Sequence, residues 1–185
     1  MKRRSNAISI LLRGYQMTGD NRYAELARKA LKSFTIPFDQ GGVMAMTEHG
    51  PFYEEYTAEI PTLVLNGMIF TLCGIYDFVR VFPEDQTAKT LFDDGIRTLR
   101  SLLPDYDLGY WSRYNLCKSD WYPETDPSTI TYQHFHAFQL ELLSQITGDE
   151  VFKLYSRKFR KQINIINILR MYYQKYKALK KLNRL

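Results

Sequence analysis

Apolar residues at the start of the chain recur with the period of an α-helix, with lysines and glutamates between them. The apolar positions are Ala7, Ile8, Leu11, Leu12 and Tyr15 in a first segment, and Tyr23, Leu26, Ala27, Ala30, Leu31 and Phe34 in a second. Between the segments lies Thr18-Gly19-Asp20, in which the glycine suits a helix C-terminus and the aspartate suits the N-cap of the next helix. This pattern predicts a helical hairpin.

The same pattern returns twice. One further hairpin joins residues 139–146 to 151–163 through Thr147-Gly148-Asp149, and a looser one joins 61–79 to 87–103 through a turn around Pro83. In each pair an apolar helix precedes a more charged one, so we expect the first to be buried nearly all round and the second to show one face to water. The predicted fold class is all-α, with about three helical hairpins of an (α/α) toroid-type barrel. Because three hairpins make only part of a ring, we expect an oligomer or a larger unit.

Two stretches without a helical pattern predict long rim loops. Residues 36–60 are rich in glycine and proline around the run Val43–Met46, which predicts a loop anchor or a short strand of a β-hairpin. Residues 104–131 combine prolines with many tyrosines, tryptophans and aspartates. Both stretches precede an inner helix, so we expect them at the same rim of the toroid. Long ordered loops on a rigid scaffold are common places for functional sites.

Charge is distributed unevenly along the 185 residues, a length that fits one domain. Residues 151–185 carry eleven basic and no acidic residues, whereas the first 150 carry 14 basic against 20 acidic. The net charge of +5 is therefore a property of the tail and predicts no nucleic-acid partner. We expect a domain over 1–160 and a basic amphipathic helix or tail over 161–185. The tail is either a closing helix with a solvated face or a segment attracted to an anionic polysaccharide or membrane surface.

Several classes of protein are excluded by what the sequence lacks. Cys73 and Cys117 form no disulfide framework, which indicates a reducing compartment, by default the cytoplasm. The N-terminal apolar stretch is too short for a signal peptide, and residues 63–81 are too often interrupted to form a transmembrane segment. The three histidines have no metal-site spacing, and nucleotide-binding glycine loops are absent, so we predict no metal and no cofactor.

Two clusters of polar and aromatic residues are the candidates for chemistry. One is Phe52–Tyr56, and the other begins at Tyr106-Asp107 and continues through Trp121-Tyr122 to His134. Tyrosine and tryptophan offer a flat apolar face and a polar edge, which suits sugar rings. The alternative is that these aromatic residues pack the loops onto the helices.

Six motifs along residues 6–160 resemble, in order, the C-terminal helical domain of the D-glucuronyl C5-epimerases. Tyr53-Glu54-Glu55-Tyr56, followed by Pro61 and Leu65-Asn66-Gly67, resembles the family's YEEYP…LNG signature. The other segments are Ala7-Ile8-Ser9, Gly74-Ile75-Tyr76-Asp77, Leu102–Gly109, Tyr114-Asn115-Leu116 and Tyr132–Leu140. Each motif alone is weak, but six in order with near-constant spacing are specific.

The resemblance implies an epimerase that removes the C5 proton of glucuronate in a polysaccharide and returns one from the other face, giving iduronate. The catalytic residues that it implies are Glu55, Tyr56, Tyr114 and Tyr132. The implied substrate-binding residues are Tyr53, Glu54, Asn66, Tyr106, Arg113, Asn115, Lys118 and His136. The implied partners are an anionic uronate-containing polysaccharide and either further copies of the chain or a missing N-terminal domain. Animal members of the family lie in the Golgi lumen.

The chain departs from the family pattern at the position of the arginine that the resemblance implies for binding the sugar carboxylate. Where the family has YDLRH, this sequence has Cys117 in place of the arginine and Asn115 in place of the aspartate, and Lys118 or Arg113 are the nearby basic residues. Three other functions therefore stay open. They are a non-catalytic polysaccharide-binding or assembly subunit, a uronate lyase, and a glycosidase in which Asp107 or Asp126 would complement Glu55.

Overall fold

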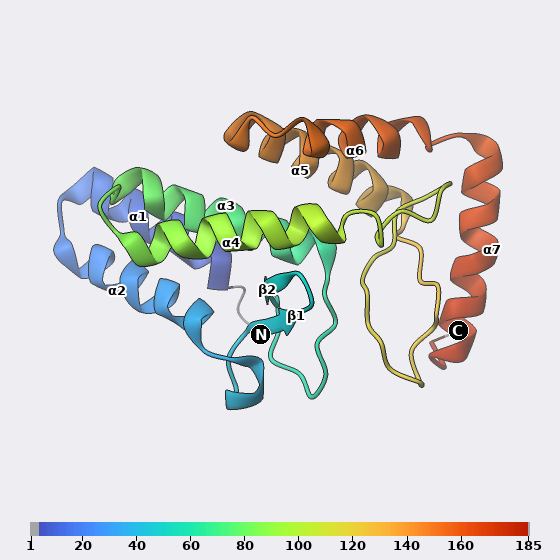
Figure 1. The fold of residues 1–185 in the computed structure, drawn as a ribbon, viewed down its shortest axis with the longest axis horizontal. Coiled ribbons are helices and arrows are strands. Elements are labelled where there is room, and N and C mark those ends of the chain that lie inside the picture. Colours follow the sequence, from blue (N-terminus) through green and yellow to red (C-terminus); the bar gives the residue numbers. More distant parts are fainter. Residues whose placement is uncertain (1–3, 185) are drawn as a thin grey trace. The chain divides into compact units, whose positions relative to one another are not determined.

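The computed structural model describes residues 4–184, and the side chains from Ala7 onward. Helices dominate it, and one short antiparallel hairpin accompanies them (Figure 1). The helices are α1 (Arg4–Thr18), α2 (Asn21–Lys32), α3 (Leu65–Val81), α4 (Gln86–Leu102), α5 (Ile130–Thr147), α6 (Glu150–Lys161) and α7 (Ile165–Lys181), and the strands are β1 (Met44–Thr47) and β2 (Gly50–Tyr53). This confirms the all-α fold class with a short β-hairpin. No helix in the described range is both long and apolar enough to span a membrane.

The two Thr-Gly-Asp turns fold in the same way. Gly19 and Gly148 adopt left-handed backbone angles, with φ of 68° and 71°, which an L-residue adopts only at a cost. The next aspartate then caps the following helix: Asp20 accepts from the Arg22 amide and Asp149 from the Val151 amide, both at 2.9 Å. The sequence thus specifies the turns of the α1–α2 and α5–α6 hairpins locally.

Contact clustering divides the chain into two compact units. Unit 1 holds the residues up to Pro61 together with Gly67–Ser101, and unit 2 holds Thr62–Asn66 together with the residues from Leu102 onward. Unit 1 therefore contains α1, α2, the β-hairpin, most of α3, and α4 except its last residue. Unit 2 contains the long loop 103–129, α5, α6 and α7. The predicted boundary near residue 160 stays a prediction.

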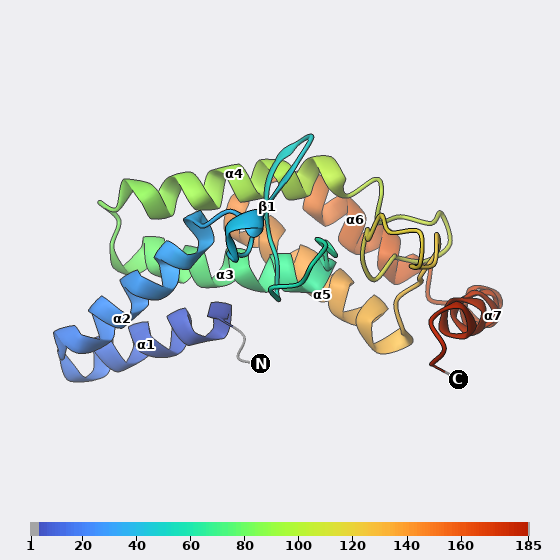
Figure 2. The same ribbon diagram turned by 90° about the horizontal axis from the view of Figure 1, so that it is seen from below.

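In unit 1, α3 and α4 run side by side (Figures 1 and 2). The rings of Tyr76 of α3 and Phe92 of α4 lie at a tilt of 35° to each other, with centroids 5.4 Å apart. In accord with the prediction for the first helix of a hairpin, α3 is buried along most of its length. For α1 that prediction is wrong: Ile10 and Met17 are 68% and 85% exposed, because only the face with Ile8 and Leu12 packs into the core.

The start of α3 differs from the sequence prediction. A helix was expected from Pro61, but α3 begins at Leu65. Leu63 has a positive φ of 53°, and Val64 pairs with Asn115 in an antiparallel bridge. The Leu65 amide also donates to the Tyr114 carbonyl, at 3.3 Å. Residues 62–64 are therefore tied to the 103–129 loop in an extended form, and the helix can begin only after them.

In unit 2, α5 and α6 form a hairpin, and α7 runs roughly perpendicular to both (Figures 1 and 2). The chain turns at Gln162, which closes α6, and Asn164, whose side chain caps α7 by accepting from the Asn167 amide. Trp111 anchors the long loop, since it is fully buried and its indole donates to the Ser128 carbonyl at 2.8 Å. Met171 of α7 packs against Trp111 and fixes that helix to the loop.

Candidate functional site

Tyr114 and Tyr132 lie together in unit 2. Tyr114 is held in the loop because its amide donates to the Asp126 carbonyl at 3.0 Å, while its carbonyl accepts from Leu65. Tyr132 stands in the first turn of α5, where its amide donates to the capping side chain of Thr129. The two half-buried rings meet edge to face, with centroids 5.2 Å apart. Two of the four predicted catalytic residues are therefore neighbours.

His136 follows one turn later on α5, and its ring centroid lies 6.2 Å from that of Tyr132. It is fully buried, and Nδ1 lies 2.8 Å from the Ser112 hydroxyl oxygen. Burial lowers the pKa of His136 to about 3, so the imidazole is neutral at physiological pH. Within the described part of the chain, no group hydrogen-bonds to Nε2.

A chain of hydrogen bonds that starts at Asp107 fixes the orientation of two buried amides. Because a carboxylate only accepts, the Gln162 Nε2 must be the atom that donates to Asp107, at 2.8 Å. The Gln162 oxygen then accepts from the Gln133 Nε2 at 3.1 Å, and the same Nε2 donates to the Phe159 carbonyl. The oxygen of Gln133 is therefore directed at Ser112.

This orientation determines the tautomer of His136. The Gln133 oxygen accepts from the Ser112 hydroxyl at 2.6 Å, the shortest of the bonds around that hydroxyl, and the proton of Ser112 is used there. The Ser112 oxygen then accepts the Nδ1 proton of His136. A neutral imidazole has one proton, so Nε2 carries a lone pair. The site thus presents a buried nitrogen that can accept a hydrogen bond or a proton.

Two further buried polar atoms lie along the same part of the structure. The Gln139 Nε2, one turn after His136, donates to the Asn66 carbonyl at 3.3 Å. The Asn66 Oδ1 and the Gln139 Oε1 have no hydrogen-bond partner among residues 4–184. Buried polar atoms without a partner are uncommon, and a ligand or water usually satisfies them. Together with His136, they give unit 2 a polar region with unused hydrogen-bonding capacity.

Lys175 of α7 reaches the same region. Its Nζ lies 2.6 Å from Asp126 Oδ1 and 5.8 Å from the centre of the Tyr114 ring. The other oxygen of Asp126 accepts from the Tyr122 hydroxyl at 2.6 Å, and the Tyr122 hydroxyl oxygen accepts from the side-chain Nδ2 of Asn115. Burial, with the Asp126 carboxylate as a second cause, raises the pKa of Tyr122 and keeps it protonated. The sequence motifs gave no signal for Lys175, since it is far from Tyr114 along the chain.

The other predicted residues of unit 2 are more peripheral or structural. Tyr106 is fully buried, and its hydroxyl donates to the Leu63 carbonyl at 2.6 Å, so it anchors the loop. Arg113 donates to the Glu124 carbonyl. Asn115 is buried and uses its oxygen to accept from the Cys117 amide. Lys118 is exposed to solvent.

In unit 1, the predicted residues of the Tyr53–Tyr56 motif differ in burial. Tyr53 and Glu54 are buried, and the Tyr53 hydroxyl donates to the Leu91 carbonyl at 2.7 Å. Glu55 and Tyr56 are half-buried in the segment after β2. Gly67 packs closely beside them, because a Cβ at that position would lie 3.0 Å from the Cβ of Glu55. Only Glu55 and Tyr56 of this motif therefore stay in our candidate set.

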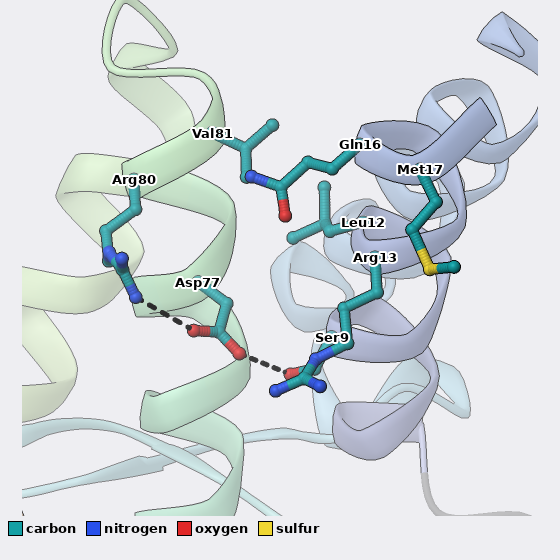
Figure 3. Close-up of a pocket in the computed structure, with 8 residues that line it drawn as sticks. All are labelled: Ser9, Leu12, Arg13, Gln16, Met17, Asp77, Arg80 and Val81. Atoms are coloured by element: carbon teal, nitrogen blue, oxygen red, sulfur yellow. Dashed lines mark hydrogen bonds and ion pairs between the residues drawn. The ribbon is translucent and has the colours of Figure 1, made fainter. Parts of the chain in front are cut away.

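A polar cavity of about 450 Å³ in unit 1 is lined by residues from two of the other motifs (Figure 3). The Ser9 hydroxyl donates to Asp77 Oδ2 at 2.6 Å, and Arg80 lies 4.0 Å from the other carboxylate oxygen. The motifs Ala7–Ser9 and Gly74–Asp77 thus meet in one contact between α1 and α3. Across the described residues, no group of three or more metal-binding side chains is present.

Comparison with known proteins gives consistent matches. The family described as D-glucuronyl C5-epimerase C-terminus matches residues 3–161. The D-glucuronyl C5-epimerase of Caenorhabditis elegans is 32% identical over 157 residues, which cover 79% of this chain and 26% of that protein. An uncharacterized protein of Methanocaldococcus jannaschii is 30% identical over 164 residues, covering 84% of this chain and 49% of that protein. The chain thus spans half or less of the length of these relatives.

Proposed function

Because the chain belongs to the D-glucuronyl C5-epimerase family, whose C-terminal part it matches, we propose that it inverts C5 of D-glucuronate residues in a polysaccharide. The observation that supports this most strongly is the pairing of Tyr114 and Tyr132 beside the neutral, buried His136. Acid–base groups and hydrogen-bond acceptors are thereby gathered within the region matched by the family.

The reaction needs a proton acceptor on one face of the sugar ring and a proton donor on the other. The C5 proton is acidic because it is α to the carboxylate, and its removal leaves an enolate-like intermediate. A proton returned to C5 from the opposite face completes the inversion, with no net change in atoms or electrons. A tyrosine hydroxyl can donate that proton, and a carboxylate such as Glu55 can accept one. We keep Glu55, Tyr56, Tyr114 and Tyr132 as the proposed acid–base residues.

We assign the binding of the sugar carboxylate to Lys175. Cys117, at the position of the family arginine, cannot form the paired hydrogen bonds that a guanidinium makes with a carboxylate. The Lys175 ammonium is the cation that lies over the Tyr114 ring, at 5.8 Å. Asp126 holds it there at 2.6 Å. A lysine acts as a point charge, so it would attract the uronate with less directional control than an arginine.

A non-catalytic polysaccharide-binding subunit is the second candidate, and the replacement of the family arginine by Cys117 favours it. A glycosidase is less well supported. Asp107 accepts from Gln162 and pairs with Lys158, and Asp126 pairs with Lys175 and Tyr122. Both carboxylates are therefore engaged in structural contacts, and neither is placed as a second catalytic acid.

Hydrogen exchange at C5 tests the proposal. The full chain is incubated with a glucuronate-containing polysaccharide in deuterated water, and the C5 signal is followed by proton NMR. Epimerisation predicts deuterium at C5, new iduronate signals and an unchanged chain length. An unsaturated product would identify a lyase. Binding without exchange would identify the binding subunit, and either result overturns the epimerase proposal.

Variants then test the assignment of the residues. Tyr114→Phe and Tyr132→Phe each remove one hydroxyl while keeping the ring, and each should slow exchange by about 10²-fold or more. Tyr155→Phe is the matched control, because Tyr155 is a half-buried tyrosine of α6 outside the site, and exchange should stay at the wild-type rate. If the control slows exchange as much as the site variants, the assignment is wrong.

A further inference from the structure

The helix α7 lies beyond the region that the family matches, since the match ends at residue 161 and α7 begins at Ile165. One face of α7 packs onto unit 2 through the buried residues Met171 and Ala178. Lys175 also lies on this inner side, in its ion pair with Asp126. The helix is therefore held in place by one side, and its other side is available for a different role.

The outer side of α7 carries an apolar surface along residues 165–176. Six large side chains are more than half exposed: Ile165, Ile166, Leu169, Tyr172, Tyr173 and Tyr176. At about 100° per residue, these positions fall within an arc of about 120° on the helix. Single exposed apolar residues are normal, but a contiguous stripe of this kind indicates an interaction surface. We call these six residues the outer face.

Cations border the outer face, and α7 itself contributes no acidic side chain to it. Lys177 is exposed at about 120° on the same helical wheel, directly beside the apolar arc, and Lys180 falls at about 60°, one turn beyond Tyr176. Arg170 and Lys181 fall at about 140–160° and also contact the rest of unit 2, since Arg170 lies over the Tyr110 ring at 3.8 Å and Lys181 donates to the Tyr122 carbonyl. Lys177 lies 4.3 Å from the centre of the Tyr173 ring, so its charge is at the edge of the apolar surface. Residues 151–185 contain no acidic residue. The chemistry of this face is therefore apolar and positive together.

We propose that the outer face of α7 binds the surface of an anionic lipid bilayer, with the helix axis parallel to the membrane plane. Isoleucine and leucine side chains would enter the boundary between headgroups and acyl chains, the three tyrosines would lie at headgroup level, and the bordering cations would contact lipid phosphates and carboxylates. Seventeen residues with five cations do not cross a bilayer, but they suit a helix that lies on one.

Two other occupants fit the surface less well. Pairing of two outer faces in a dimer would bring cations against cations, because α7 offers no carboxylate to oppose them. A polysaccharide would satisfy the charges, but Ile165, Ile166 and Leu169 offer no hydrogen-bond donor or acceptor to its hydroxyl groups. The bilayer matches both properties of the face. This inference does not depend on the proposed enzymatic activity.

Vesicle co-sedimentation of the full chain tests the proposal. Vesicles of phosphatidylcholine alone are compared with vesicles that also contain about 30% phosphatidylserine, chosen so that the surface is anionic. The expected result is binding to the anionic vesicles, much weaker binding to the neutral ones, and weakening as salt is raised. Equal binding to both kinds of vesicle, or to neither, would overturn the proposal.

Matched variants locate the contact. Leu169→Asp, in the outer face, should weaken vesicle binding at least ten-fold, and Leu154→Asp, at an equally exposed leucine of α6, should not change it. Lys177→Gln should weaken binding about five-fold, and Lys161→Gln at the end of α6 should have a smaller effect. Circular dichroism confirms that each variant keeps its helical content.

The alternatives give different outcomes. If Leu169→Asp abolishes binding to a glucuronate polysaccharide and leaves vesicle binding unchanged, the face binds polysaccharide. If sedimentation shows a dimer that Leu169→Asp dissociates, and vesicles do not compete with it, the face binds a second copy. Each of these results refutes the membrane assignment. Because the variants avoid Lys175 and the tyrosine pair, C5 exchange in solution should stay at the wild-type rate in all of them.

Discussion

The buried imidazole of His136 should make the stability of unit 2 dependent on pH. In the folded state burial lowers the pKa of His136 to about 3, whereas an unfolded chain has a histidine pKa of about 6.5. As pH falls below 6.5, the unfolded state therefore takes up a proton that the folded state does not. The contribution of His136 to stability does not change above about pH 6.5, and stability is lost progressively as pH falls from 6.5 towards 3.

The magnitude follows from the two pKa values. Where the unfolded state binds one proton more than the folded state, the free energy of unfolding changes by about 1.4 kcal/mol for each pH unit. Integration from pH 7 to pH 5 gives a loss of about 2 kcal/mol, because proton uptake by the unfolded chain is only partial near pH 6.5. That loss is a large fraction of the stability of a typical domain.

The assay is urea unfolding followed by tryptophan fluorescence at pH 7 and pH 5. Both tryptophans of the chain, Trp111 and Trp121, belong to unit 2 and report on the environment of His136. His136→Asn keeps a donor towards Ser112 but cannot titrate, so the loss between the two pH values should shrink by about 2 kcal/mol relative to wild type. His134→Asn, at an exposed position two residues earlier, is the control and should keep the pH dependence.

A second measurement does not depend on the folding of the variant. Heteronuclear NMR of the wild-type imidazole carbons should show His136 neutral and unprotonated at Nε2 down to pH 4. The reasoning is refuted if His136 titrates near pH 6.5, or if the wild type and His136→Asn lose the same stability between pH 7 and pH 5.

Two further predictions concern the scaffold. Asp149→Ala removes the N-cap of α6 and should lower the free energy of unfolding by about 1 kcal/mol, whereas Asp149→Asn, which keeps the cap, should lie within a few tenths of wild type, as measured by urea unfolding. Gly95→Ala on α4 should destabilise unit 1 by about 1–2 kcal/mol even though alanine favours helix, because the new Cβ would lie 2.6 Å from Leu72 and 2.8 Å from the ring of Tyr53, which its hydroxyl tethers to Leu91. Thr90→Ala on the exposed side of α4 is the control, and a thermal midpoint at or above that of wild type is expected. A stabilised Gly95→Ala protein would contradict the packing argument.

The helices and their hairpin turns could be predicted because their determinants are local. A left-handed glycine followed by a capping aspartate specifies the turn at Gly148-Asp149 within a few residues, and the turn at Gly19-Asp20 repeats it. The start of α3 could not be predicted in the same way. It depends on the pairing of Val64 with Asn115, a contact between residues far apart in sequence that no local pattern records.

In the candidate site, too, local sequence predicted some features, and others depend on contacts between distant residues. Tyr114, Tyr132 and His136 were found through short motifs, and the structure brings these three residues together. The aromatic residues Tyr53 and Tyr106 belong to equally clear motifs but serve as buried anchors, with their hydroxyls bonded to backbone carbonyls. A motif therefore identifies which positions matter, and only burial and hydrogen bonding distinguish a residue that can meet a substrate from one that supports the fold.

Cys117 stands where the family has an arginine, and Lys175 of α7 is the cation that we propose in its place. The helix α7 lies beyond the region that the family matches. The family arginine is absent from the loop, and the cation over Tyr114 comes instead from α7, which Met171 and the Asp126 ion pair fix to unit 2. A helix that supplies an inner cation to the site and an outer face towards a membrane would link the two proposals physically. Displacement of α7 would remove Lys175 from Tyr114, so a change that loosens the inner face of α7 should impair substrate binding, whereas Leu169→Asp on the outer face should impair vesicle binding alone.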